Sequence, residues 1–411
     1  MNPISSTTLD CGTTLVIEKI SGVRSVALNW LLPAGAARDP HDRLGWSAVT
    51  SEMLLRGAGN LDSRAFTDAC DMLGLSRSVD AGTIHMKLSA TMLGQRLGEA
   101  LPLLTDLALR PRFDPQSLDP ARELALASIE SLKDDPHQRA VLAARDRHYP
   151  EPINRSGMGT TEDLEALTLD DVTSHWATCC APLGSIIAVA GDVESHDLSS
   201  RINALLQSWT GTSPPITLGP PAPRGYAHED DSSNQVQIIV VHDAPPAPSP
   251  DAYLEQIVVS ILSGGMSGRL FTEVREKRGL CYSVSASYRA DREFGSITGY
   301  VGTTPERAQE SLDVLVAELA RVGAGVTRDE FERAVVGLKS RVIFSGESSP
   351  ARAVTLASDQ YKLGRPRSLA EIAARLDSIT LDDVNAYLST RQLGTLTIQT
   401  LGPSALAAPA L

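Results

Sequence analysis

No apolar run in this 411-residue sequence is longer than a β-strand. The longest are SIIAVA at residues 185–190 and VQIIVV at residues 236–241, whereas a helix that crosses a bilayer needs about 20 apolar residues. The N-terminal segment also lacks the basic stretch followed by an apolar stretch that marks a secretory signal peptide. We therefore expect a cytoplasmic protein that does not bind membranes.

Basic runs and CxxC pairs of cysteines are missing too. The net charge is −13 and no Lys/Arg cluster occurs, which argues against binding to nucleic acids or to anionic membranes. Without a CxxC pair, neither a zinc ribbon nor a thioredoxin-like redox motif is expected. The number of cysteines is odd and their spacing is scattered, which suits a reducing compartment. They are Cys11, Cys70, Cys179, Cys180 and Cys281.

What the sequence does contain is an internal repeat. LTLDDV at residues 167–172 recurs as ITLDDV at residues 379–384, which is 212 positions later. In each copy a Thr stands just ahead of an Asp-Asp pair, a pattern typical of a helix start, so Thr168 and Thr380 are expected N-caps. A unit of roughly 200 residues is too long for a solenoid repeat, and we predict two homologous domains.

A second match and a linker define the halves. PHQRAV at residues 136–141 is similar to PARAV at residues 350–354, at nearly the same offset. Between the halves lies TGTSPPITLGPPAPRG, which is rich in Pro and Gly and predicts a semi-rigid, extended connection. We place one domain at residues 1–211, the linker at 212–225 and the second domain at 226–411.

Each half mixes strands and helices without strict βαβ alternation. Residues 13–20 and 234–244 alternate in period two and predict strands, whereas residues 115–135 and 305–323 follow a helical pattern. This order predicts an α+β fold, in which each domain has an antiparallel β-sheet with helices packed on one face.

Several segments match one known family. The strongest is LSGGMSGRLFTEVREKRGLCYSVSASY at residues 262–288, and MLLRGAG and SIIAVAGDVE in the first half match as well. On these motifs, which extend over nearly the whole chain, the protein resembles the M16 peptidase family of pitrilysin and insulin-degrading enzyme. It is most similar to the bacterial M16B branch. The resemblance implies two domains of the M16/LuxS-like metallohydrolase fold.

The resemblance also implies a zinc site that this sequence has lost. Active members carry H-x-x-E-H on the first helix, where two His and a downstream Glu hold Zn²⁺ and the Glu between them is the general base. Aligned on MLLRG, and with the downstream ligand 76 positions after the second His (128 − 52), the four positions are Ala48, Ser51, Glu52 and Ser128. One carboxylate does not replace three protein ligands. Because the eight histidines also form no pair at i and i+4, we expect no metal in this chain.

The second half retains the family's substrate-binding pattern, R-x-x-x-Y after a glycine-rich turn. It is present as Arg278 and Tyr282, behind Gly264 and Gly265. Guanidinium and phenol groups both donate hydrogen bonds, which suits a peptide carbonyl that becomes an oxyanion. Taken alone, a solvated helix end and an aromatic strand residue explain the same two positions. The P-loop pattern and the GxSxG elbow are absent, so the glycines are interpreted as turn residues near substrate.

Some M16B peptidases divide these parts between two chains, and the resemblance implies that this chain is the non-catalytic subunit. A homologous partner with H-x-x-E-H would hold the zinc, and this chain would orient the peptide without a cofactor of its own. One alternative is a structural scaffold like the core proteins of a respiratory complex, which share the fold. Another is an enzyme with a relocated site, although the sequence nominates no nucleophile and base for it.

Overall fold

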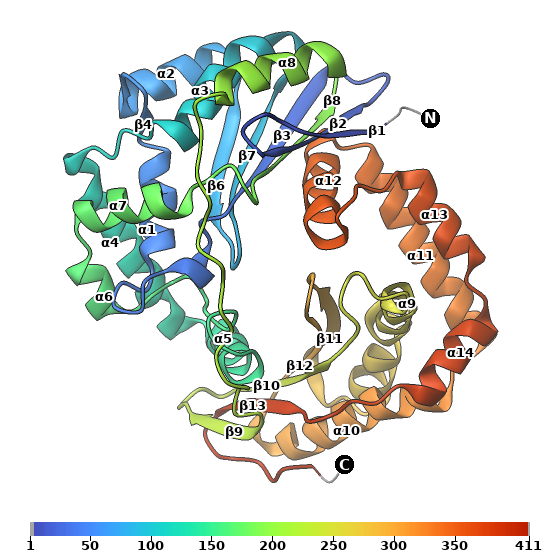
Figure 1. Cartoon of the computed structure of the whole chain (residues 1–411). Coiled ribbons are helices and arrows are strands. Elements are labelled where there is room, and N and C mark those ends of the chain that lie inside the picture. Colours follow the sequence, from blue (N-terminus) through green and yellow to red (C-terminus); the bar gives the residue numbers. More distant parts are fainter. Residues whose placement is uncertain (1–3, 410–411) are drawn as a thin grey trace. The chain divides into compact units, whose positions relative to one another are not determined.

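A computed structural model describes residues 4–409 as two compact units, both of which draw on each half of the sequence. Unit 1 comprises the chain up to Ser131, Glu151–Gly219 and Ser345–Arg367. Unit 2 comprises Leu132–Pro150, Pro220–Phe344 and the chain from Ser368 onwards. Figure 1 gives the element labels that are used below.

Unit 1 consists of one six-stranded sheet, a two-stranded ribbon and surrounding helices. The sheet strands are β1 (Ile4–Thr8), β2 (Thr14–Lys19), β3 (Ser25–Leu32), β6 (Ser76–Ala81), β7 (Met86–Leu93) and β8 (Ile186–Gly191). The ribbon strands are β4 (Gly57–Ala58) and β5 (Leu61–Asp62). The α-helices are α1 (Trp46–Leu54), α2 (Ser63–Met72), α3 (Leu97–Leu109), α4 (Pro115–Ser131), α6 (Thr161–Ala166), α7 (Leu169–Cys179), α8 (Ser195–Leu206) and α12 (Ser349–Leu363). Short 3-10 turns are η1 (Ala36–Arg38) and η2 (Gly94–Arg96).

Unit 2 has a five-stranded sheet and its own set of helices. The strands are β9 (Gly225–Asp230), β10 (Val236–Asp243), β11 (Cys281–Ala290), β12 (Gly295–Thr303) and β13 (Thr397–Gly402). The α-helices are α5 (Pro136–His148), α9 (Ala252–Ser263), α10 (Ala308–Arg321), α11 (Arg328–Gly346), α13 (Leu369–Ser378) and α14 (Leu381–Thr390). The short turns are η3 (Leu132–Asp134), η4 (Phe271–Glu276), η5 (Pro305–Arg307) and η6 (Val322–Ala324).

The two sheets share one topology, which confirms the predicted duplication. Unit 1 has the order β1-β2-β8-β3-β7-β6, and unit 2, read from its other edge, has β9-β13-β10-β12-β11. The equivalent pairs also run in the same sense, because β2 with β8 and β9 with β13 are parallel whereas the remaining pairs are antiparallel. The α+β class is therefore confirmed, with one parallel pair in each otherwise antiparallel sheet.

The repeated Thr-Leu-Asp-Asp segments begin equivalent helices, as predicted. Thr168 is the N-cap of α7 and Thr380 is the N-cap of α14. Each forms a capping box, in which the Thr hydroxyl accepts from the backbone of the third helical residue and that residue's Asp side chain accepts from the Thr backbone. The box satisfies N–H groups that have no partner within the helix.

Both faces of each sheet are covered, not only the one expected from the sequence. In β3 of unit 1, Val26, Leu28 and Trp30 join the large core beneath α1, α3 and α7, whereas Ala27 and Leu31 face the other way. That second face packs against Ala353, Leu356 and Ala357 of α12. Strands buried on both faces are near-continuous apolar runs, which explains why β3 and β10 depart from a simple alternation.

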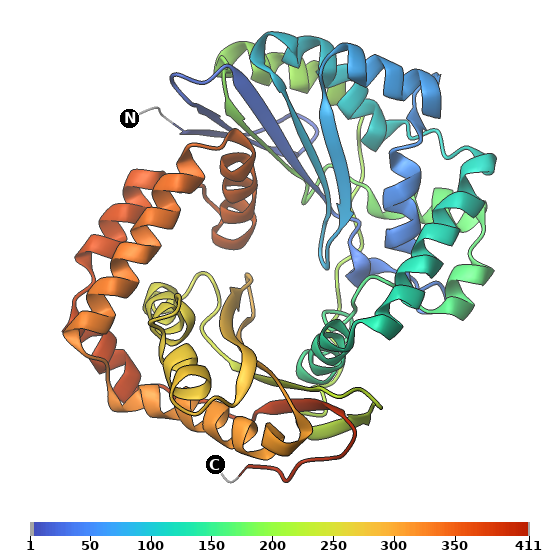
Figure 2. The same cartoon turned by 180° about the vertical axis from the view of Figure 1, so that it is seen from behind.

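The helix on the second face comes from the opposite half of the sequence in both units. Helix α12 packs on β3 and β8 of unit 1, and α5 packs on β10 and β13 of unit 2 (Figures 1 and 2). The contiguous division at 1–211 and 226–411 thus differs from the compact units in two exchanged segments, residues 132–150 and 345–367. These segments contain the PHQRAV and PARAV motifs, so the sequence match marks the exchanged helices.

An arginine attaches each exchanged helix to its sheet. Arg352 of α12 pairs with Glu18 of β2 and donates to the Arg367 carbonyl at 2.5 Å. At the equivalent place in unit 2, Arg139 of α5 pairs with Glu229 of β9 and with Asp231. Arg352 is 1% exposed, so its ion pair is by far the more buried of the two.

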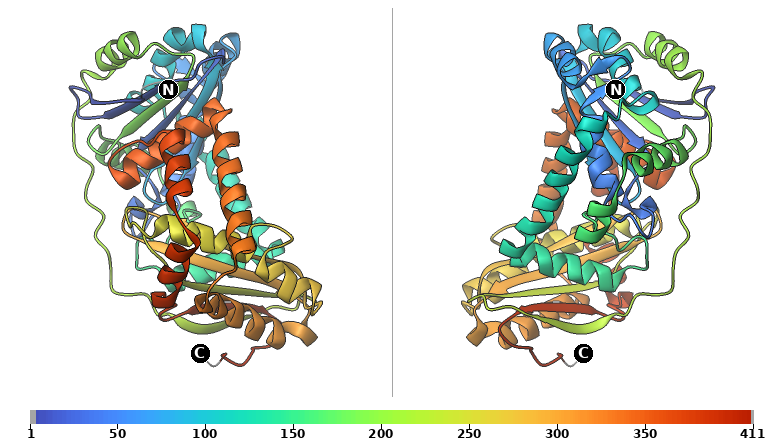
Figure 3. Two further views of the ribbon diagram at one scale, coloured as in Figure 1. Left: turned by 90° about the vertical axis from the view of Figure 1, so that its right-hand side faces the viewer. Right: turned by 90° about the vertical axis from the view of Figure 1, so that its left-hand side faces the viewer.

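Residues 213–224 form no helix or strand, and the part up to Gly219 belongs to unit 1 (Figure 3). Thr212 forms a parallel bridge with Leu183, and the Ser213 hydroxyl donates to the Pro33 carbonyl at 3.2 Å. The Gly219 N–H donates to the Glu151 carbonyl at 2.7 Å.

No helix among residues 4–409 is long and apolar enough to cross a membrane.

Candidate functional site

The first helix of unit 1 carries three of the four positions at which the resemblance implies zinc chemistry. Helix α1 starts where the Asp39 carboxylate accepts from the Gly45 and Ser47 N–H groups at 2.9 and 3.1 Å, which fixes its first turn. Ala48 and Glu52 are half-buried, and α1 packs directly against α4. Because Ser128 lies on α4, the structure brings the two predicted helices of the motif together.

The side chains at these positions do not fit zinc. The Ser51 hydroxyl donates to the Ala48 carbonyl at 2.7 Å, and the exposed Ser128 hydroxyl donates to the Leu124 carbonyl at 2.9 Å, so both are engaged within their own helices. Glu52 is then the only one of the four side chains that could serve as a zinc ligand, whereas a zinc site needs three or four nitrogen, sulfur or carboxylate ligands. Among residues 4–409 no three His, Cys, Asp or Glu side chains form a group that could hold a metal ion.

The predicted substrate-binding residues all lie in unit 2, along one segment from α9 to β11. Gly264 and Gly265 form an exposed turn directly after α9, and α9 packs on β11. Gly265 has φ +147°, a conformation that side chains disfavour. Gly264 has an ordinary φ, but a Cβ there would lie 2.2 Å from the Ser260 carbonyl oxygen. The turn thus favours glycine at both positions, for two different physical reasons, and the contact of these residues with substrate stays a prediction.

Arg278 follows a single π-helical turn, η4, and a carboxylate holds it in place. Its Nη1 donates to the Glu273 carbonyl at 2.6 Å and to the Glu273 carboxylate at 2.8 Å. Hydrogen bonds from Lys277 and Arg278 lower the pKa of Glu273 to about 2, so this anchor is ionised at physiological pH. The Arg278 side chain remains 38% exposed, so its other guanidinium donors are available to a ligand.

Tyr282 occupies a β-bulge on an edge strand. The pairing of β11 with β12 runs from Cys281 opposite Thr303 directly to Ser283 opposite Gly302, so Tyr282 is the extra residue. Bulges re-aim side chains and are frequent beside functional sites. The Tyr282 side chain is 71% exposed, and its hydroxyl has no hydrogen-bond partner among the described residues. The structure therefore presents a free phenol close in sequence to the anchored guanidinium.

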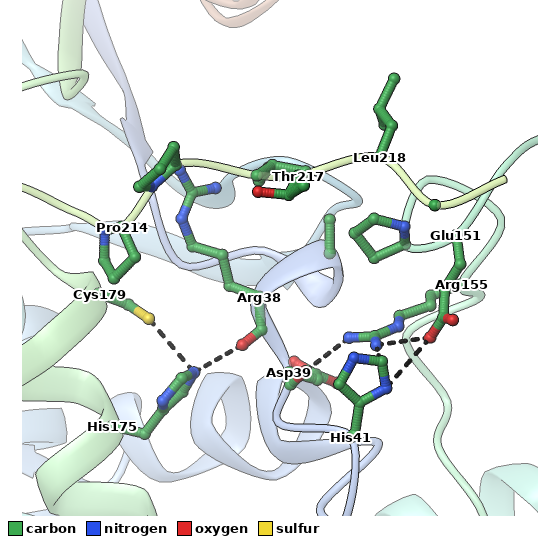
Figure 4. Close-up of a pocket in the computed structure, with 15 residues that line it drawn as sticks. Arg38, Asp39, His41, Glu151, Arg155, His175, Cys179, Pro214, Thr217 and Leu218 are labelled. Atoms are coloured by element: carbon green, nitrogen blue, oxygen red, sulfur yellow. Dashed lines mark hydrogen bonds and ion pairs between the residues drawn. The ribbon is translucent and has the colours of Figure 1, made fainter.

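A cavity in unit 1 was not predicted from the sequence. It has a volume of about 450 Å³ and lies between η1, α7, the segment after α5 and the linker (Figure 4). The lining residues are 37–39, 41, 151–152, 155, 175, 179 and 214–219. The one local signal was the spacing of His175 and Cys179, which are four residues apart and share a face of α7.

His175 and Cys179 are in contact, but they do not form an activated nucleophile. The Sγ–Nε2 distance is 3.2 Å, and His175 Nε2 also lies 2.7 Å from the Arg38 carbonyl oxygen. Since a carbonyl only accepts, Nε2 carries the proton and does not take one from the thiol. Burial raises the pKa of Cys179 to about 11 and lowers the pKa of His175, so thiol and imidazole are both neutral at pH 7.

The fold and these sites define a class: a duplicated α+β protein with two exchanged helices, in which the first helix of unit 1 forms no group of metal-binding side chains with its neighbours among the described residues. Residues 14–159 match the insulinase family, peptidase family M16, and residues 166–338 match the peptidase M16 inactive domain. The chain belongs to the M16 peptidase family.

Relatives and solved structures agree with this assignment. An uncharacterized zinc protease of Streptomyces coelicolor is 25% identical over 93% of this chain and 86% of its own length. The uncharacterized zinc protease YmxG of Bacillus subtilis is 24% identical over 93% and 94%. A peptidase M16 inactive domain of Pseudomonas fluorescens has a TM-score of 0.87 at 22% identity and covers 99% of both chains. A chain of complex III₂ of Candida albicans has a TM-score of 0.81 at 18% identity, over 98% of this chain and 96% of its own.

Proposed function

We propose that this chain is the non-catalytic subunit of a heterodimeric M16 zinc metallopeptidase and that it orients the peptide substrate. Zinc and its general base would be held by a homologous partner that carries H-x-x-E-H. The observation that carries the proposal is the state of Tyr282. An aromatic side chain that is 71% exposed, sits on a bulge and has an unused hydroxyl contributes little to the stability of its own unit, whereas it is available to a ligand.

Two neighbouring features support peptide binding at this place. Strand β11 is an edge strand whose outer backbone groups are not paired within the sheet of unit 2, and extended peptides add to such edges through main-chain hydrogen bonds. Glu273 fixes the guanidinium of Arg278, which reduces the conformational entropy lost when it binds a carbonyl oxygen. Arg278 and Tyr282 would thus contribute up to two oriented donors to the substrate backbone.

The second candidate is a scaffold without a role in proteolysis. It is favoured by the changes at Ala48, Ser51, Glu52 and Ser128, and by the fold shared with the chain of complex III₂. A scaffold does not use Arg278 or Tyr282, so substitution of either residue distinguishes the two functions.

The test compares peptide hydrolysis by this chain, by an H-x-x-E-H homologue from the same genome, and by the co-purified pair. The proposal predicts that the pair hydrolyses quenched peptides much faster than either chain and that a chelator abolishes the activity. If both chains co-purify but their activity is no higher than that of the homologue alone, the scaffold replaces the proposal.

Single-residue variants then test whether Arg278 and Tyr282 bind the substrate. Tyr282→Phe removes only a hydroxyl and should lower kcat/KM by about threefold to tenfold, which corresponds to one neutral hydrogen bond. Arg278→Gln removes a charged donor and should lower it by about tenfold to a hundredfold. Arg328→Gln is the matched control, because Arg328 is also an exposed ion-paired arginine of unit 2. Co-purification should be unchanged in all three variants, and wild-type turnover in both Arg278→Gln and Tyr282→Phe would refute the assignment.

A further inference from the structure

The cavity of unit 1 contains a cation without a counterion. Arg38 lines it, and its guanidinium forms no ion pair with a carboxylate among residues 4–409. Its Nε donates to the Ser213 hydroxyl at 2.8 Å, and its Nη1 reaches the Ile84 carbonyl at 3.4 Å, so both partners are neutral. The neighbouring Arg155, by contrast, is bonded to the Asp39 carbonyl and paired with Glu151 at 2.8 Å. A partly buried and unpaired charge is unfavourable unless a ligand compensates it.

The walls of the cavity restrict the chemistry of that ligand. Much of the lining is apolar, and Ala37, Pro152, Pro214, Pro215 and Ile216 contribute to it. The volume of about 450 Å³ is within the range of small-molecule sites. A dianion such as phosphate has no second free cation here and would face the carboxylate of Glu151. A metal cation would face Arg38 and would have to displace the proton of a thiol whose pKa burial raises to about 11.

We propose that this cavity is a binding site for a small apolar monocarboxylate, with the Arg38 guanidinium as the group that binds the carboxylate. All residues involved lie in unit 1, and the inference is independent of the proposed peptidase role. The linker residues 214–219 form one wall of the site, and Ser213 contacts the anchoring guanidinium. An occupied site therefore holds the linker on unit 1, so that ligand binding and linker order are coupled.

The experiment uses hexanoate and its uncharged analogue hexanamide on the full chain. All four tryptophans lie in unit 1, so the thermal midpoint followed by Trp fluorescence reports this unit; they are Trp30, Trp46, Trp176 and Trp209. Saturating hexanoate should raise the midpoint by a few degrees, whereas hexanamide should not. Amide hydrogen exchange of residues 216–219 should slow in the presence of hexanoate.

Variants separate this site from a general effect of anions. Arg38→Met keeps an unbranched apolar stem without the guanidinium and should weaken hexanoate binding by at least about tenfold, which is the loss of one charge-assisted hydrogen bond. Ser213→Ala removes the linker contact of Arg38 and keeps the charge, so it measures the part of the loss that comes from linker loosening and should weaken hexanoate binding less than Arg38→Met does. Arg64→Met changes an arginine that is 92% exposed in the same unit and should retain full binding. Equal stabilisation by hexanamide, by inorganic phosphate or in Arg38→Met would overturn the proposal, as would the absence of any effect of hexanoate.

Discussion

One buried ion pair stabilises the exchanged helix α12 on its sheet in addition to the apolar packing, and Arg352→Met measures its contribution. Arg352 is 1% exposed, and the Glu18 side chain is 12% exposed, so substitution leaves a carboxylate with little access to water. Breaking a buried pair in this way costs about 3–5 kcal/mol. Since Glu18 retains some exposure, we expect the lower end, about 3 kcal/mol.

The assay is urea unfolding monitored by Trp fluorescence, which reports on unit 1 because all four tryptophans lie there. A loss of about 3 kcal/mol should lower the urea midpoint by roughly 1 M for a unit of this size. The double variant Glu18→Gln with Arg352→Met removes both charges, and also the buried Arg352 Nη1 that has no hydrogen-bond partner. It should regain most of the lost stability, because replacing both partners of a buried pair is often neutral.

The matched control is Arg139→Met in α5. Arg139 is the equivalent arginine of unit 2, but its side chain is 25% exposed, and its partners Glu229 and Asp231 are 40% and 16% exposed. Solvent screens these pairs more than the Arg352 pair, so the loss should be smaller, and because Arg139 belongs to unit 2 it should leave the Trp transition unchanged. The reasoning fails if Arg352→Met shifts that transition by less than about 0.3 M, or if the double variant is less stable than the single one.

Two further outcomes are expected. Acid should unfold unit 2 early: burial lowers the pKa of His148 and of His242 to about 4, whereas the unfolded chain takes up these protons near pH 6.5. The stability that the two neutral histidines contribute is therefore present above pH 6.5 and is lost as the pH falls towards 4. Urea midpoints measured by circular dichroism should decline over this window, and less steeply in His148→Gln. Midpoints that do not change with pH would contradict the prediction. Thr168→Ala removes the N-cap of α7 and should cost about 1 kcal/mol in the Trp-detected transition, whereas an unchanged midpoint would mean that solvent caps this helix equally well.

The parts of the fold that depend on local patterns were predictable from the sequence. The Thr-Leu-Asp-Asp segments located α7 and α14, since a capping box forms within four residues. The exchange of α5 and α12 was not predictable, although their motifs were found to match. A helix carries no local signal for which of two similar sheets it covers; that choice depends on the packing of Ala140, Ala353 and their neighbours.

The same distinction applies to the sites. Ala48, Ser51 and Glu52 follow from the register of one helix, so the sequence alone was enough to align them with the positions at which the resemblance implies zinc chemistry. The bulge at Tyr282 is a property of strand pairing. The sequence predicts an aromatic residue on a strand there, but not the direction in which its side chain points. The cavity combines residues 38, 155, 175, 179 and 214–219, which only the tertiary fold brings together.

The exchange of helices has a consequence for the synthesis of the chain. The second face of the unit 1 sheet, with Val16, Ala27 and Leu31, is covered by a helix that ends at Leu363. A ribosome must therefore translate the codon of Leu363, more than 300 codons after those of this sheet's strands β2 and β3, before this face can be buried. Until then the nascent protein carries an uncovered apolar sheet face, which is a liability for aggregation and a natural substrate for chaperones. A premature stop anywhere before the α12 segment removes the cover of the N-terminal sheet as well as the C-terminal residues.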